Sequence, residues 1–170
     1  PPYVGSIAAK AGLAAPQWAS FTGMAYNAGS IIGYIGFGFL ADAFGRKPVT
    51  LSFFAMSLLL TPVFFLWTHE LNMLLVVAGF LGMFASGQFT WMSTWLPELF
   101  PTQLRATGVG LIFNGPRVLA AIGVFIAGTL IVYFGGYGNA AMIVATIYIL
   151  GLIVGPFLPE TRGKPLPESV

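Results

Sequence analysis

The chain has 170 residues, of which 57% are hydrophobic and only 7% are charged, and its formal net charge is +2. Soluble domains carry roughly 25% charged residues, so this composition cannot build a water-facing surface and excludes a soluble enzyme. The small net charge and scattered basic residues exclude a nucleic-acid partner. The absence of cysteine and the single histidine, His69, leave no ligand set for a metal, and we expect no cofactor.

Long runs without a charged residue divide the chain into membrane-spanning segments. Each run is at least as long as the ~20 residues that a helix needs to cross the hydrocarbon core, and none alternates like a barrel strand. The last run, 118–159, is long enough for two crossings and is broken by turn-forming residues at 135–139. We expect an all-α membrane protein with about five transmembrane helices, covering residues 18–42, 49–67, 72–96, 106–134 and 139–158.

The segments outside these spans set the predicted orientation. Residues 1–17 are too short and too rich in proline to span, and are expected to be an outer loop after the end of a preceding helix. Residues 18–158 form the helical bundle, and residues 159–170 form a tail. If the turn after the first helix faces the cytoplasm, most of the positive charges lie inside, namely Arg46, Lys47, Arg105, Arg162 and Lys164. The sequence therefore predicts a multi-pass protein of the cell membrane, in contact with lipid, with a cytoplasmic carboxy terminus.

Small residues are frequent in the first predicted helix. Gly29 and Gly33 form a GxxxG step, and Gly36 and Gly38 continue the pattern. Such residues let two helix backbones approach closely in lipid. Tight packing is the simpler interpretation, although a carrier whose helices slide past one another could use the same surfaces.

The turn that follows this helix carries the most specific local pattern, G-x-x-x-D-x-x-G-R-K from Gly38 to Lys47. Gly45 permits a sharp reversal of the chain, and Pro48 suits the first turn of the next helix. Asp42 can cap a neighbouring helix or pair with a guanidinium. Without further evidence, this turn is simply a charged cytoplasmic loop.

The turn resembles the loop signature of the major facilitator superfamily, which follows the second helix and, in altered form, the eighth. Residues 97–108, PELFPTQLRATG, resemble the loop between helices ten and eleven, and residues 159–164, PETRGK, resemble the motif after helix twelve of sugar porters. The resemblance covers essentially the whole chain, and the motifs fall in the family's order. It implies helices eight to twelve of a twelve-helix fold, a partial bundle whose partner is the amino-terminal half.

The resemblance also implies a cytoplasmic charge network that holds the outward-facing state. Its members in this chain would be Asp42, Arg46, Glu98, Arg105 and Glu160. The predicted topology puts all of them on one membrane face. A single solvated ion pair contributes only ~0–1 kcal/mol, so a latch would need the whole network. The alternative is that these charges serve only loop solubility and orientation.

Arg117 stands out because it is charged and lies deep within a predicted span. It is about eleven residues from the helix boundary, roughly 15–18 Å into the bilayer, where a charge costs at least ~2.5–3.5 kcal/mol. Arg117 therefore either binds an anionic substrate or pairs with a carboxylate of the amino-terminal half. Asn114 lies one turn away, and Pro116 predicts the kind of helix distortion that carriers use near binding sites.

Three further residues are substrate-binding candidates. Gln88 can offer hydrogen bonds and Trp91 a stacking surface, and Asn27 is a polar residue within the first span. Each of them could equally contact only a neighbouring helix or lipid. Tyr26 and Tyr34 are candidates of the same rank as Asn27.

These residues predict a secondary active carrier of a small metabolite, an organic anion or a sugar, that works by alternating access and is not an enzyme. Arg117 favours the anion. The family commonly couples uptake to protons, but no membrane-embedded Asp, Glu or His is present, since Asp42 lies at the membrane edge. A proton site would therefore come from the amino-terminal half, or the carrier is a uniporter. The rival is a non-transporting membrane scaffold or receptor-like relative, against which the polar residues Arg117, Asn114 and Gln88 argue.

Overall fold

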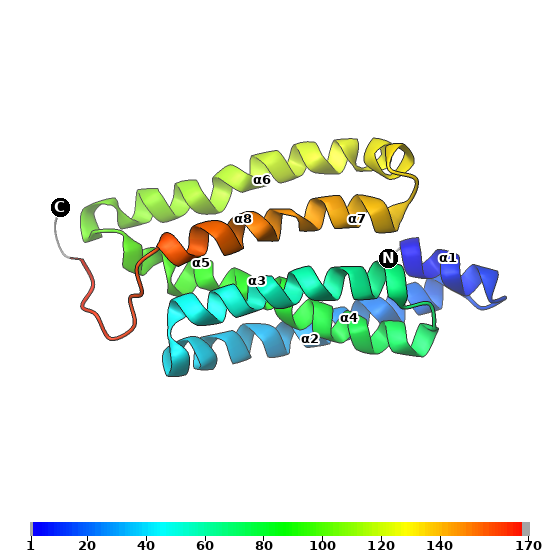
Figure 1. Ribbon diagram of the computed structural model, residues 1–170, viewed down its shortest axis with the longest axis horizontal. Helices are drawn as coiled ribbons and strands as arrows, with labels where there is room; N and C mark the ends of the chain where they lie inside the picture. The colour runs from blue at the N-terminus through cyan, green and yellow to red at the C-terminus, as the bar shows by residue number, and fades with distance from the viewer. Residues whose placement is uncertain (1, 168–170) are drawn as a thin grey trace.

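The structure is a computed structural model that describes residues 2–167, and every regular element in that range is helical (Figure 1). The first helices are α1 (Pro2–Lys10), α2 (Ala15–Phe44), α3 (Arg46–Pro62), the π-helix η1 (Val63–Trp67) and α4 (Leu71–Gly87). The short elements η2 (Gln88–Thr90), α5 (Trp91–Thr94) and η3 (Leu96–Leu99) continue α4. The last are α6 (Thr102–Tyr133), α7 (Tyr137–Ala145), α8 (Ile147–Val154) and η4 (Gly155–Phe157).

The prediction of five membrane spans is confirmed. Five helical stretches are long and apolar enough to cross a membrane: Ala15–Phe44, Arg46–Trp67, Leu71–Leu99, Thr102–Tyr133 and Tyr137–Phe157. The third and fifth stretches are not continuous α-helices, because α4 gives way to the 3-10 turn η2 and a turn at Thr146 separates α7 from α8.

Two helices begin earlier than the sequence predicts. The first starts at Ala15 and the fourth at Thr102, where the predicted starts are 18 and 106. In both cases a proline lies at or next to the observed start of the helix. Pro16 occupies the first turn of α2, and Pro101 stands immediately before α6. A proline at such a position costs little, because the N–H that it lacks would have no intrahelical partner.

The long helices run side by side along the longest axis of the molecule (Figure 1). The α2–α3 turn, η3 and the carboxy-terminal tail lie together at the left-hand end of that view. We call this the charged end, because it carries Asp42, Arg46, Glu98 and Glu160. The chain between α3 and α4 and the turn between α6 and α7 lie at the opposite end.

The closest contact in the bundle is the crossing of α2 and α4. A Cβ placed on Gly33 would lie 2.0 Å from the carbonyl oxygen of Met83, and one on Gly29 would lie 1.8 Å from that of Gly79. Both distances are far below a van der Waals contact, so only glycine fits. The structure therefore supports the tight-packing interpretation of the GxxxG step.

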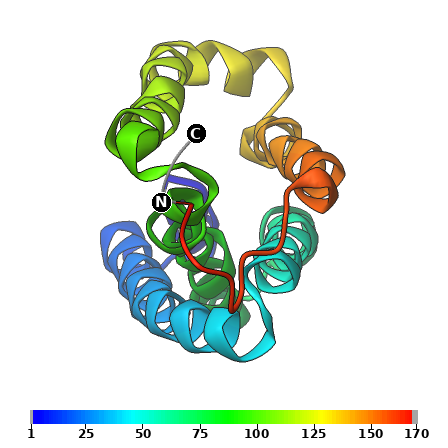
Figure 2. The same ribbon diagram turned by 90° about the vertical axis from the view of Figure 1, so that its left-hand side faces the viewer.

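By contrast, α6 stands apart from the other long helices (Figure 2). None of its residues is buried. A cavity of about 620 Å³ separates it from α4, with Ala120, Gly123 and Ala127 on one side and Leu81 and Ala85 on the other. Long apolar side chains cover its surface, including Phe125 at 90% exposure. This helix thus presents a wide face that the described part of the chain does not cover.

Candidate functional site

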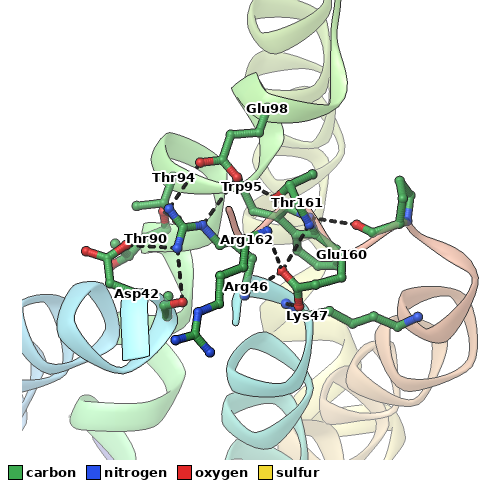
Figure 3. Close-up of polar contacts among 12 residues, drawn as sticks. Asp42, Arg46, Lys47, Thr90, Thr94, Trp95, Glu98, Glu160, Thr161 and Arg162 are labelled. Carbon is green, nitrogen blue, oxygen red and sulfur yellow. Dashed lines mark hydrogen bonds and ion pairs between the residues drawn. The ribbon is translucent and has the colours of Figure 1, made fainter. Parts of the chain in front are cut away.

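Arg46 is the centre of the polar contacts at the charged end (Figure 3). Its Nε and Nη2 atoms donate to the two carboxylate oxygens of Glu98, each at 3.2 Å. Its Nη1 atom lies 2.8 Å from Oδ1 of Asp42 and also donates to the carbonyl oxygen of Ala41 at 3.1 Å. The Glu98 side chain is 22% exposed and that of Asp42 is 74% exposed. The bidentate Glu98 pair is therefore the better shielded of the two.

Among residues 2–167, Glu160 pairs with backbone amides and not with a cationic side chain. Its Oε1 accepts from the backbone N–H of Arg46 and its Oε2 from that of Lys47, both at 3.0 Å. Oε1 also accepts from the N–H groups of Thr161 and Arg162 at 3.0 Å. Burial by itself raises the pKa of Glu160, but these backbone hydrogen bonds outweigh it, so the pKa lies below its ordinary value. A carboxylate thus caps the amino terminus of α3.

The tail that carries Glu160 has further contacts at the charged end. The hydroxyl of Thr161 donates to Oε2 of Glu98, which joins the two carboxylate clusters. The indole N–H of Trp95 donates to the carbonyl oxygen of Pro159 at 3.1 Å. The tail is thereby held against both α3 and the segment that follows α5.

Gly45 makes room for this arrangement. Its φ of 109° suits glycine alone, and a Cβ there would lie 2.7 Å from Oε2 of Glu160. The absence of a side chain at Gly45 therefore allows both the predicted sharp reversal of the chain and the close approach of the tail.

Arg105 is not part of an ion pair within residues 2–167. Its Nε donates to the carbonyl oxygen of Pro97 at 2.9 Å, and its Nη2 donates to those of Phe100 and Pro167, both at 3.3 Å. The structure thus brings Asp42, Arg46, Glu98 and Glu160 together, whereas Arg105 binds the loop and the tail through backbone oxygens.

A second candidate region, with a few hydroxyl groups in a mainly apolar lining, lies between α2, α5 and α6. A cavity of about 670 Å³ is lined there by Tyr34, Phe89, Thr90, Ser93, Val109 and Phe113. We call it the α2–α6 cavity. The hydroxyl of Thr90 is buried and has no hydrogen-bond partner among the described residues. Ser93 and Phe113 cannot be recognised from the sequence, because hydroxyls and aromatic rings are common in membrane helices and only their convergence distinguishes these.

Arg117 lies one helical turn beyond this cavity. Its guanidinium carbon is 4.1 Å from the ring centroid of Phe113, a cation–π contact. Its side chain is exposed, and no ion pair to it is found within residues 2–167. Asn114 is also exposed and donates to the carbonyl oxygen of Gly110 at 2.9 Å. α6 continues through Pro116 without ending there.

The other substrate-binding candidates are elsewhere. Nε2 of Gln88 donates to the hydroxyl of Tyr148 on α8 at 3.2 Å, on the side of the helix away from α6. Trp91 packs against the aromatic cluster of Phe37 and Phe53. Asn27 is exposed on α2 and lines none of the cavities described here. Of the five predicted residues, only Arg117 and Asn114 lie near the α2–α6 cavity.

Comparison with known sequences decides the family. Residues 2–169 match the family described as the Major Facilitator Superfamily. The chain belongs to this superfamily. It is therefore an integral, multi-pass membrane protein, and its five helices form part of the superfamily's bundle, as the loop motifs predicted.

Individual superfamily members match most of this chain. A Haemophilus influenzae protein named "Putative metabolite transport protein" is 31% identical over 76% of this chain and 32% of its own length. The glycine betaine/proline/ectoine/pipecolic acid transporter OusA of Dickeya dadantii is 32% identical over 76% of this chain and 26% of its own. Human solute carrier family 22 member 12 is 33% identical over 77% of this chain and 23% of its own length. The chain thus spans about a third or less of these relatives.

Proposed function

We propose that this chain is the carboxy-terminal part of a secondary active carrier that moves a small organic anion by alternating access. The observation that carries the proposal is Arg117, an exposed cation midway along the 32-residue helix α6. A charge at such a depth is costly without a compensating partner. A substrate anion that enters beside the α2–α6 cavity would supply one.

The surroundings of Arg117 suit a carboxylate. The cation–π contact with Phe113 holds one face of the guanidinium and leaves its N–H groups at the edge free to donate. An arginine can bind a carboxylate through two parallel hydrogen bonds. The hydroxyls of Thr90, Ser93 and Tyr34 line the adjoining cavity and could bind the remaining polar groups of a small metabolite.

The substrates named for one relative agree with this chemistry. OusA is named for glycine betaine, proline, ectoine and pipecolic acid. Each of these compounds carries a carboxylate as part of a zwitterion without net charge, and a neutral sugar carries none. A substrate with a carboxylate is therefore favoured over the sugar that the loop motifs would equally allow.

Uptake of acidic and neutral metabolites by the complete carrier tests the proposal. Arg117→Gln should raise KM for acidic substrates roughly 10- to 100-fold, as expected for a lost hydrogen bond to a charged group. Arg117→Lys should keep part of the affinity, and the tail variant Arg162→Gln is the matched control, because Arg162 is exposed at the charged end. Equal loss for both substrate classes would contradict the proposal, because it would make Arg117 a structural residue that pairs with the rest of the carrier.

We also propose that uptake is coupled to protons, with the titrating group outside this chain. The acidic residues within the described spans, Asp42 and Glu98, both pair with Arg46 at the charged end and not at mid-membrane. Collapse of the pH gradient should stop accumulation in intact cells. Unchanged accumulation would contradict the proposal of proton coupling but not the proposal of an anion site at Arg117. The proposed setting is the cell membrane, with lipid around the bundle and the charged end in the cytoplasm.

A further inference from the structure

A second small cavity lies on the other side of the η2–α5 segment, away from α6. Its volume is about 180 Å³, and its walls include Phe54 of α3, Gln88 and Trp91 of η2–α5, and Tyr148 and Gly151 of α8. We call it the Gln88 cavity. It faces the packed pair α3 and α8, whereas the α2–α6 cavity faces the proposed anion site.

Gln88 carries an unsatisfied acceptor in this cavity. The residue is only 6% exposed, and its Oε1 has no hydrogen-bond partner among the described residues. A buried polar atom without a partner costs roughly 1–3 kcal/mol, so a water or a ligand atom is expected to satisfy it.

The orientation of the Gln88 amide is fixed by its neighbours. Nε2 donates to the carbonyl oxygen of Ala85 at 3.1 Å and to the hydroxyl of Tyr148 at 3.2 Å. The carbonyl of Ala85 can only accept, so the amide group that faces it must be the NH₂. Oε1 is therefore the atom left over, and only a hydrogen-bond donor can satisfy it.

The helices on both sides of this cavity are interrupted. The α-helical pattern of α4 changes to a 3-10 turn at Gln88–Thr90, and the turn at Thr146 separates α7 from α8 just before Ile147 and Tyr148. Interruptions of membrane helices where they line a cavity are typical of ligand sites. If this region served only for close packing of the helices, neither interruption would be needed.

The size and charge of the cavity define the ligand. No charged side chain lines it within the described residues, which favours a neutral ligand. An apolar cavity of about 150 Å³ admits benzene, so this cavity is large enough for a ring of that size. The aromatic walls of Phe54 and Trp91 suit such a ring, and the one unsatisfied acceptor requires one donor group.

We propose that the Gln88 cavity binds a neutral, membrane-dissolved alcohol or phenol of about benzene size, whose hydroxyl donates to Oε1 of Gln88. The Tyr148 hydroxyl, which accepts from Gln88, lies beside it and can donate to the same ligand oxygen. The proposal does not rest on the anion site, although Phe89 and Met92 line both this cavity and the α2–α6 cavity.

Fluorescence quenching in the complete carrier, reconstituted in lipid nanodiscs, tests this proposal. The probes are 4-bromobenzyl alcohol and 4-bromotoluene, which differ by the hydroxymethyl group, at matched concentrations in the membrane. Trp91 is the reporter, isolated by subtracting the signal of the Trp91→Phe variant. The alcohol should reach half-quenching at about five- to tenfold lower concentration than the toluene, as one neutral hydrogen bond predicts.

The variants make the assignment specific. Gln88→Leu should abolish the preference for the alcohol, and Gln88→Met is the second choice if the leucine variant folds poorly. Ser86→Ala is the matched control, because Ser86 lies nearby on α4 but bonds to Tyr26 instead. An equal response to both probes, a preference that survives Gln88→Leu, or no quenching of Trp91 would overturn the proposal. The last result would mean that the cavity holds only water.

Discussion

At the residue scale, the two glutamates of the charged end have different roles. Glu98 neutralises the guanidinium of Arg46, while Glu160 satisfies backbone N–H groups at the start of α3. α3 has no side-chain cap from Gly45, the residue before it. Solvated ion pairs contribute little individually, whereas unsatisfied helix ends are costly. Glu160 therefore docks the tail by supplying a cap from a distant part of the chain.

The docking of the tail should depend on pH. The pKa of Glu160 is lowered in the folded state, so its contribution to stability is complete above the ordinary glutamate pKa of about 4.3. It should be lost as the pH falls below that value through the lowered pKa. The indole N–H of Trp95 donates to the carbonyl oxygen of Pro159, so its NMR resonance reports whether the tail is docked.

The variant Glu160→Gln should loosen the tail even at neutral pH, because the amide has one accepting oxygen where the carboxylate has two. Glu70→Gln is the control, since Glu70 immediately precedes α4 at the opposite end of the bundle. Release of the tail with a midpoint above the ordinary glutamate pKa would contradict this account.

We propose, from the family resemblance, that the charged end acts as a conformational latch. Substitution of Arg105 tests this proposal. Its guanidinium ties the loop at Pro97 and Phe100 to the tail at Pro167. Arg105→Ala should leave membrane insertion intact and reduce uptake, because the tie to the tail is lost. Normal uptake by this variant would show that these contacts serve only loop structure, and Arg162→Ala provides the comparison for a simple loss of charge.

At the element scale, the α2–α4 crossing determines how closely the bundle packs. Gly33 and Gly87 meet at this crossing, with a Cβ on Gly87 only 2.7 Å from the carbonyl carbon of Gly33. The GxxxG spacing predicts one smooth face on α2 but not its partner. The partner is decided by tertiary packing, because a glycine pattern on one helix does not show which neighbouring helix it meets.

Gly33→Ala should destabilise the protein. An alanine normally stabilises a helix by about 1 kcal/mol relative to glycine, but here the new Cβ would collide with the carbonyl of Met83. Overpacking of this kind costs about 1–3 kcal/mol. Gly36→Ala, on the same helix with no atom within 4 Å of the new Cβ, is the matched control. Thermal unfolding in detergent should give a lower Tm for Gly33→Ala alone, and equal Tm values would show that the crossing is looser than described.

At the scale of the whole molecule, α6 is the helix that the described part of the chain covers least. It contributes no buried residue, yet it carries Arg117 and part of the α2–α6 cavity. The chain covers about a third or less of its relatives. A second helical half against α6 would complete the walls of the proposed substrate path, and alternating access requires two such halves.

These 170 residues alone should therefore insert into the membrane but not transport. Uptake of acidic metabolites by cells that express the chain, compared with cells that express the complete carrier, measures this. Substrate-specific uptake by the chain alone would refute both the partial-site interpretation and the alternating-access proposal.

The sequence by itself determined the membrane spans, the superfamily and the charged loops, because apolar run length and short turn motifs are local properties. It also marked Arg117, since a charge within an apolar run is visible without a structure. Tertiary structure alone decided the partners: Glu160 caps α3, Arg105 binds carbonyl oxygens, and Gln88 faces α8 and not the α2–α6 cavity. A hydrophobic pattern does not show which side of a helix faces which neighbour when nearly all sides are apolar, and only the packed helices assign each polar atom its partner.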